Sequence, residues 1–149
     1  MEFESQKIIE SPNSSWNWVV PEIQQILAVN SMANCFVKDI NGHCWRVCPE
    51  ELSATLVAKT DQEVQDVFNN PDYKIDWQLL GLIDPAEEYL GKLKKGECFA
   101  MVKPAIIGGE YSINNLRVGS IYEYLSLTGD IAYQTKDLKD GDQVSICIT

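Results

Sequence analysis

The feature that most constrains the fold is a pair of short apolar runs on either side of an Asn-Gly dipeptide. The runs cover about residues 34–39 and 43–48, and Asn41-Gly42 lies between them. Asn-Gly supplies the positive φ angles that a tight hairpin turn needs, so the runs are predicted to pair as antiparallel strands. Pro49 then ends the second strand, because it has no N–H to donate to the ladder.

Capping patterns place the helices that follow. Thr60-x-x-Glu63 predicts a helix over residues 61–70, with Val64, Val67 and Phe68 on its buried face. Ser120-x-x-Glu123 predicts another that runs to about Gln134. A third is expected from Asp84-Pro85 to Gly91, since Asp caps a helix start and Gly follows a helix end.

The remaining segments complete an α+β prediction, a single domain with a mostly antiparallel sheet and several short helices. Strands are expected at residues 54–59 and 97–103, and a closing strand at 143–148 after an Asp140-Gly141 turn. Residues 1–15 are expected to form a loose leader and residues 16–30 an amphipathic helix. We therefore divide the chain into an N-terminal leader and helix, 1–33, and an α+β domain, 34–149.

Several classes of protein are disfavoured by composition. No run of about 18 apolar residues exists to span a membrane, and the acidic start lacks the basic and apolar parts of a signal peptide. The five cysteines are odd in number, which favours reduced thiols and a cytoplasmic location over a disulfide framework. His43-Cys44-x3-Cys48 departs from zinc-site spacing, and no second ligand pair follows, so no metal or cofactor is expected.

Charge is concentrated in one part of the chain. Residues 50–90 hold ten acidic and two basic residues, a net charge of −8, out of −10 for all 149 residues. A field of this sign repels phosphate backbones and argues against direct nucleic-acid binding. It either attracts a basic protein or simply keeps the protein soluble.

The motifs of common enzymes are missing. Gly108-Gly109 is followed by Glu110, without the lysine of a phosphate-binding P-loop, so the two glycines are interpreted as a structural turn. His43 is the single histidine, and no nucleophile and acid are evident beside it. The pairs Glu50-Glu51 and Glu87-Glu88 do not face each other on a helix, so no catalytic residue is assigned.

An ordered set of short motifs resembles one known family, the C-terminal domain of type VI secretion DNase-immunity proteins. The resemblance covers about residues 34–149, after only about 33 residues, where members of the group often have a further domain. Its motifs are Cys48-Pro49-Glu50-Glu51-Leu52, Asp76-Trp77, Leu90-Gly91-x-Leu93, Lys95-Gly96-Glu97-Cys98-Phe99, Gly108-Gly109-x5-Asn115-Leu116, Tyr124-Leu125-Ser126 and Gly129-Asp130.

The resemblance implies a non-enzymatic protein without a cofactor that neutralises a co-inherited toxin, often a nuclease. A nuclease is basic where it holds nucleic acid, so an inhibitor gains by presenting acids. The oligomeric state is left open. Two alternatives remain, a small enzyme that uses carboxylates and a scaffold domain that binds another basic protein. The residues predicted to contact the partner are Glu50, Glu51, Asp61, Glu63, Asp66, Asp76, Trp77, Glu87 and Glu88.

Overall fold

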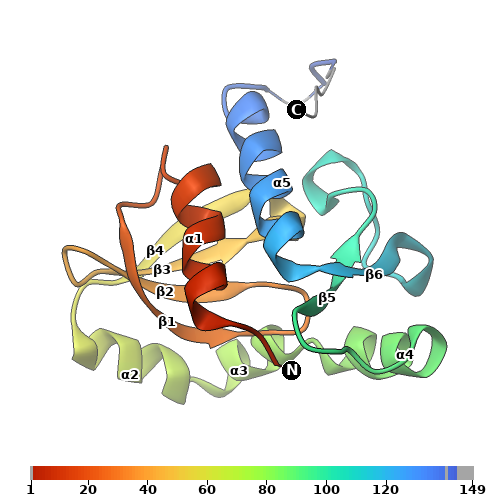
Figure 1. Cartoon of the computed structure of the whole chain (residues 1–149), viewed down its shortest axis with the longest axis horizontal. Coiled ribbons are helices and arrows are strands. Elements are labelled where there is room, and N and C mark those ends of the chain that lie inside the picture. Colours follow the sequence, from red (N-terminus) through yellow and green to blue (C-terminus); the bar gives the residue numbers. More distant parts are fainter. Residues whose placement is uncertain (1, 140, 144–149) are drawn as a thin grey trace.

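A four-stranded antiparallel sheet forms the centre of the computed structural model, which describes residues 2–139 and 141–143. Its strands follow one another in chain order as β1 (Ile23–Val29), β2 (Cys35–Asp39), β3 (Cys44–Cys48) and β4 (Ser53–Ala58) (Figure 1). The predicted hairpin is confirmed as β2–β3. Its turn closes where the Asp39 N–H donates to the His43 carbonyl oxygen at 2.8 Å, and Gly42 has φ +80°.

One face of this sheet, the α1/α5 face, is covered by α1 (Ser5–Ser15) and α5 (Ile121–Thr135), which pack side by side (Figure 1). The core there is apolar and includes fully buried Ile8, Trp16 and Leu125. The capping box that predicted α5 is confirmed, because the Ser120 Oγ accepts a hydrogen bond from the Glu123 N–H at 3.2 Å.

Two expectations for the N-terminal part are wrong. Residues 1–15 are not a loose leader, because α1 forms there. This helix has no side-chain cap and contains Pro12, so its stability depends on packing against α5. Residues 16–30 are not a helix but lead into β1. The register of β1 against β2 shifts twice. Each bulge interrupts the alternation of inward and outward side chains along the strand, so the apolar residues of β1 have a spacing typical of a helix.

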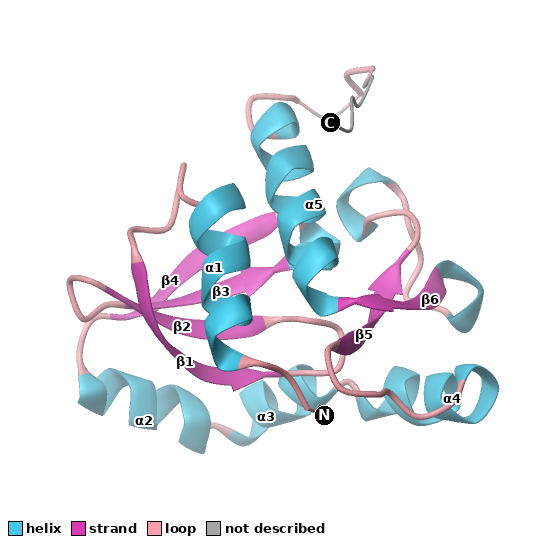
Figure 2. Cartoon of the chain, in the orientation of Figure 1, coloured by secondary structure: helices cyan, strands magenta, loops and turns pink. Residues whose placement is uncertain are grey.

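The opposite face of the sheet, the α2/α3 face, is covered by α2 (Asp61–Asn69) and α3 (Pro71–Gln78) (Figure 2). Phe36 of β2 contacts the rings of Phe68, Tyr73 and Trp77 from these helices. The Thr60 capping box that predicted α2 is confirmed by its hydrogen bond from the Glu63 N–H at 3.2 Å. Helix α3 was not predicted.

A second antiparallel sheet pairs β5 (Glu97–Met101) with β6 (Leu116–Ser120), and α4 (Leu80–Leu90) packs beside it. The predicted start of α4 is wrong, because Leu79 turns the chain at φ +48° and the helix begins at Leu80, with Asp84-Pro85 inside it. The strands at residues 54–59 and 97–103 and the α+β class are confirmed. The Asp140-Gly141 turn and the strand at 143–148 fall largely outside the described residues. In the part of the chain that the structure describes, no helix is both long and apolar enough to cross a bilayer.

Candidate partner-binding cleft

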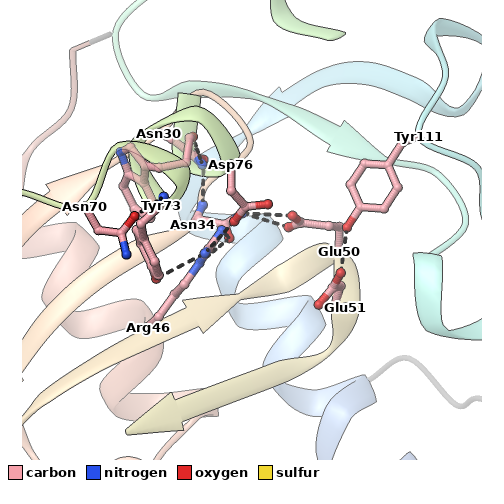
Figure 3. Close-up of polar contacts among 10 residues, drawn as sticks. Asn30, Asn34, Arg46, Glu50, Glu51, Asn70, Tyr73, Asp76 and Tyr111 are labelled. Carbon is pink, nitrogen blue, oxygen red and sulfur yellow. Dashed lines mark hydrogen bonds and ion pairs between the residues drawn. The ribbon is translucent and has the colours of Figure 1, made fainter. Parts of the chain in front are cut away.

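A partly buried arginine organises the polar side chains on the α2/α3 face. Arg46 lies on β3, and its side chain is only 16% exposed. Its Nη1 donates to Asp76 Oδ2 at 3.0 Å and to the Tyr73 hydroxyl at 3.1 Å, while Nε and Nη2 both donate to Asn34 Oδ1. The guanidinium also lies over the ring of Trp77, 5.2 Å from its centroid. Figure 3 shows Arg46 of β3 meeting Tyr73 and Asp76 of α3 and Asn34, which directly precedes β2.

Glu50 is the acid at the other end of this network. It is 2% exposed and accepts two hydrogen bonds from Asn34 Nδ2, at 3.0 and 2.8 Å. Burial raises the pKa of the Glu50 carboxyl above its ordinary value of 4.5, against the opposing effect of hydrogen bonds from its own backbone, Cys48 and Asn34. The expectation that Glu50 lies on a partner-facing surface is therefore wrong, because its carboxylate points into the protein.

A cleft of about 650 Å³ opens beside this network. The sheet side of the cleft is lined by Arg46 and Cys48 of β3 and by Ser53, Thr55, Leu56 and Val57 of β4. Its walls come from α3, from the short helix Pro49–Glu51 and from a loop that contributes Tyr111. These wall residues are Glu50, Glu51, Tyr73, Asp76, Leu79 and Tyr111.

The Gly-Gly motif forms the corner that carries Tyr111. Gly108 has φ +98°, and a Cβ on Gly109 would lie 1.8 Å from the Lys103 carbonyl oxygen, so neither position accepts a larger residue without movement. The Asn115 side chain holds the loop closed by donating to the carbonyl oxygens of Lys103 and Glu110, at 2.9 and 3.0 Å. The Tyr111 hydroxyl then donates to Glu51 Oε1 at 3.0 Å across the cleft (Figure 3).

The other predicted contact residues are distributed along the three helices rather than gathered in the cleft. Asp61, Glu63 and Asp66 are exposed on α2, and Glu87 and Glu88 are exposed on α4. Several have local partners: Asp61 pairs with Lys38 at 3.1 Å, Glu63 accepts from the Lys59 N–H, and Asp66 accepts from Gln62. Glu51 and Asp76, also exposed, line the cleft itself.

Trp77 is half-buried and stacks on Phe36 with ring centroids 4.5 Å apart. A tryptophan held in this way supports α3 and the Arg46 guanidinium more than it offers a free contact surface.

Sequence reasoning missed the residues that join the cleft together: Asn34, Arg46, Tyr73 and Tyr111. A signal existed for Arg46, which is the one charged residue in the apolar run Cys44–Cys48. A charge in a buried strand requires partners. Asn34 and Tyr111 carried no such signal, because their partners are 16 and 60 residues away along the chain.

Of the described cysteines, only Cys48 lines the cleft. Cys35, Cys44, Cys48 and Cys98 are buried free thiols, and burial raises the pKa of Cys44 to about 11. In residues 2–139 and 141–143, no three His, Cys, Asp or Glu side chains are grouped to hold a metal ion. His43 lies in the hairpin turn and does not line the cleft.

A family comparison decides which known proteins this chain is related to. Residues 60–132 match the family described as T6SS immunity protein Tdi1, C-terminal. This part of the chain is similar to that immunity-protein family. The family resemblance predicted from the sequence is thereby confirmed over α2 to α5, a shorter range than the expected 34–149. Arg46, Glu50 and β4 precede the segment that matches the Tdi1 C-terminal family.

The fold is also seen in a solved structure. The crystal structure of Atu4351 from Agrobacterium tumefaciens superposes with a TM-score of 0.57 over 82% of this chain, at 10% sequence identity. The present chain spans 64% of the length of that protein. At this identity the likeness shows the fold alone. A comparison with curated proteins finds no match.

Proposed function

We propose that this protein is an immunity protein that binds a toxin delivered by type VI secretion and blocks it in the cytoplasm of the cell that makes both. The observation that carries the proposal is the match of residues 60–132 to a type VI immunity-protein family. The matched range includes α2, α3 and α4, which hold eight of the ten acidic residues between residues 50 and 90.

The exposed acids of these helices favour a basic partner. We use the name acidic helix face for the exposed carboxylates Asp61, Glu63, Asp66, Asp72, Asp76, Asp84, Glu87 and Glu88. Only Lys59 and Lys74 offset them between residues 50 and 90. Among the described residues, Asp72, Asp84, Glu87 and Glu88 form no ion pair, so their charge is available to a partner.

A nuclease toxin fits this surface best among toxin classes. Its nucleic-acid site must be basic, and an acidic inhibitor gains from the attraction both in association rate and in register. The acidic helix face would cover that site and exclude the nucleic acid.

Co-expression tests the proposal directly. Cells that carry the toxin gene found beside this one are expected to survive only when this protein is also made, and the two proteins are expected to co-purify. Survival that does not depend on this protein would contradict the immunity function.

A matched pair of variants tests the acidic helix face. Glu87→Lys with Glu88→Lys is expected to weaken rescue and lower the association rate at low salt. Glu10→Lys with Glu22→Lys changes the net charge equally on exposed residues of other elements and is expected to leave rescue unchanged. Equal rescue by both double variants would contradict a role for this face.

A further inference from the structure

Among the described residues, the two edges of the central sheet differ in how they are protected. At the β1 edge, Asn13 Oδ1 accepts from the Ile23 N–H at 2.7 Å and Asn13 Nδ2 donates to the Ile23 carbonyl oxygen at 3.2 Å, and bulges twist the strand. At the β4 edge, no hydrogen bond from another described residue reaches the outer side of the strand. Natural proteins usually protect a free edge with charges, prolines or bulges. Strand β4, Ser-Ala-Thr-Leu-Val-Ala, contains neither charge nor proline, and its pairing with β3 shifts register once, between Leu56 and Ala58.

The ladder shows which backbone groups of β4 face outward. Antiparallel pairs alternate between hydrogen-bonded and non-hydrogen-bonded. The Asp39 N–H bonds the His43 carbonyl oxygen, so this pair is hydrogen-bonded and every second residue of β3 after His43 also faces β2. Arg46 falls between these residues, so its backbone groups face β4, where Thr55 is its partner. Ala54 and Leu56 therefore direct their N–H and C=O groups away from the sheet.

The same strand forms one side of the cleft. Ser53, Thr55, Leu56 and Val57 line it, so a peptide strand added along β4 would place alternate side chains over the cleft. The cleft volume of about 650 Å³ is enough to enclose a long side chain of such a strand.

Cleft chemistry selects a cationic side chain. Among the residues that line the cleft, the exposed acids are Glu51 and Asp76, Glu50 is buried, and the one cation is Arg46. Arg46 already donates to Asn34, Tyr73 and Asp76. By contrast, Asp76 Oδ1 and Glu51 Oε2 accept no hydrogen bond from a described residue. Two acceptor oxygens beside the rings of Tyr73 and Tyr111 suit a guanidinium or an ammonium group.

We propose that the toxin contributes an extended segment that pairs with the open edge of β4 and inserts an arginine or lysine side chain into the cleft between Asp76 and Glu51. This inference rests on the proposed function and specifies how the partner docks. Backbone hydrogen bonds to Ala54 and Leu56 would give affinity, and the cationic side chain would fix the register.

Leu56→Pro is the decisive variant. Proline removes an N–H that points outward, so the β3–β4 ladder keeps its bonds while an added strand loses a donor and meets the proline ring. Binding to the purified toxin encoded beside this gene, measured by titration calorimetry, is expected to weaken more than tenfold. Leu56→Ala keeps the N–H and is expected to weaken binding by less than about threefold, and thermal unfolding checks that both variants are folded.

A second variant tests separately whether the negative charge of the cleft contributes to binding. Glu51→Gln is expected to weaken binding severalfold at low salt and less at high salt. Overlapping synthetic peptides of the toxin are expected to include one that binds and that loses binding when its arginine or lysine is replaced by glutamine. A double-mutant cycle between that replacement and Glu51→Gln is expected to show coupling.

The outcomes separate this inference from the proposed function. Wild-type binding that Leu56→Pro and Glu51→Gln both leave unchanged would overturn the docking mode and leave the immunity function standing. A wild-type protein that does not bind the toxin would overturn both. A free protein whose self-association disappears in Leu56→Pro, with toxin binding intact, would assign the edge to a second copy and overturn the assignment to the toxin.

Discussion

The two faces of the central sheet are built for different purposes. The α1/α5 face is closed by an apolar cluster in which Ile8, Trp16, Val37 and Leu125 are fully buried. The α2/α3 face contains the chain of polar contacts from Asp76 through Arg46 and Asn34 to Glu50, and beside it the cleft. We propose that the first face supplies most of the stability and that the second carries recognition at some cost in stability.

The largest effect on stability is expected on the α1/α5 face. Trp16 is fully buried, and its Nε1 donates to the Leu125 carbonyl oxygen at 3.0 Å. Trp16→Ala is expected to lower the free energy of unfolding by about 3–5 kcal/mol, because it leaves a cavity and removes a buried hydrogen bond. Denaturant titration measures the loss, and Trp16→Phe serves as the smaller control. A loss below about 1 kcal/mol would contradict the assignment of stability to this face.

The next effect is expected in the polar network of the α2/α3 face. Asn34 is fully buried and joins Arg46 to Glu50. Asn34→Ala is expected to lower the free energy of unfolding by about 2–3 kcal/mol, because it leaves both charged groups without this partner. A double-mutant cycle with Glu50→Gln measures the coupling. Strict additivity would show that the network does not act as a unit.

The pH dependence of stability isolates Glu50. Because burial raises its pKa in the folded state above 4.5, the folded protein holds this proton more tightly than the unfolded chain. Its contribution to stability is therefore greatest below pH 4.5 and is lost as the pH rises through the folded pKa. Glu50→Gln removes this titration, so the variant is expected to gain stability relative to the wild type from acid toward neutral pH. A constant difference between the two unfolding free energies would contradict the raised pKa.

The smallest effect on stability is expected from the acidic helix face. Glu87 and Glu88 are exposed on α4 and form no ion pair within the described residues. Glu87→Lys with Glu88→Lys is expected to change the free energy of unfolding by less than about 1 kcal/mol in total, since exposed substitutions away from caps and cores are nearly neutral. Thermal unfolding checks this. A much larger loss would mean that α4 depends on these charges for folding.

Short sequence motifs correctly predicted those helices and strands whose formation depends on neighbouring residues in the chain. The Asn41-Gly42 turn and the capping boxes at Thr60 and Ser120 located β2, β3, α2 and α5, because each acts within four residues of chain. The N-terminal part could not be predicted in this way. Helix α1 depends on α5, more than 100 residues later, and the bulges of β1 depend on its pairing with β2.

The candidate site was predicted in charge but not in shape. The excess of acids between residues 50 and 90 was evident from the sequence, and most of those acids are exposed on α2, α3 and α4. Composition cannot distinguish Glu50, which is buried, from its neighbour Glu51, which is exposed. That difference arises because Asn34, brought close by the fold, offers its amide to one carboxylate and not to the other.

Amide hydrogen exchange of this protein, free and bound to the toxin encoded beside its gene, compares the two faces in one measurement. The account predicts slower exchange on binding in β4 and in helices α2 to α4. Exchange in α1 and α5 should be unchanged. Protection confined to α1 and α5, with β4 and the acidic helix face exchanging as in the free protein, would contradict it.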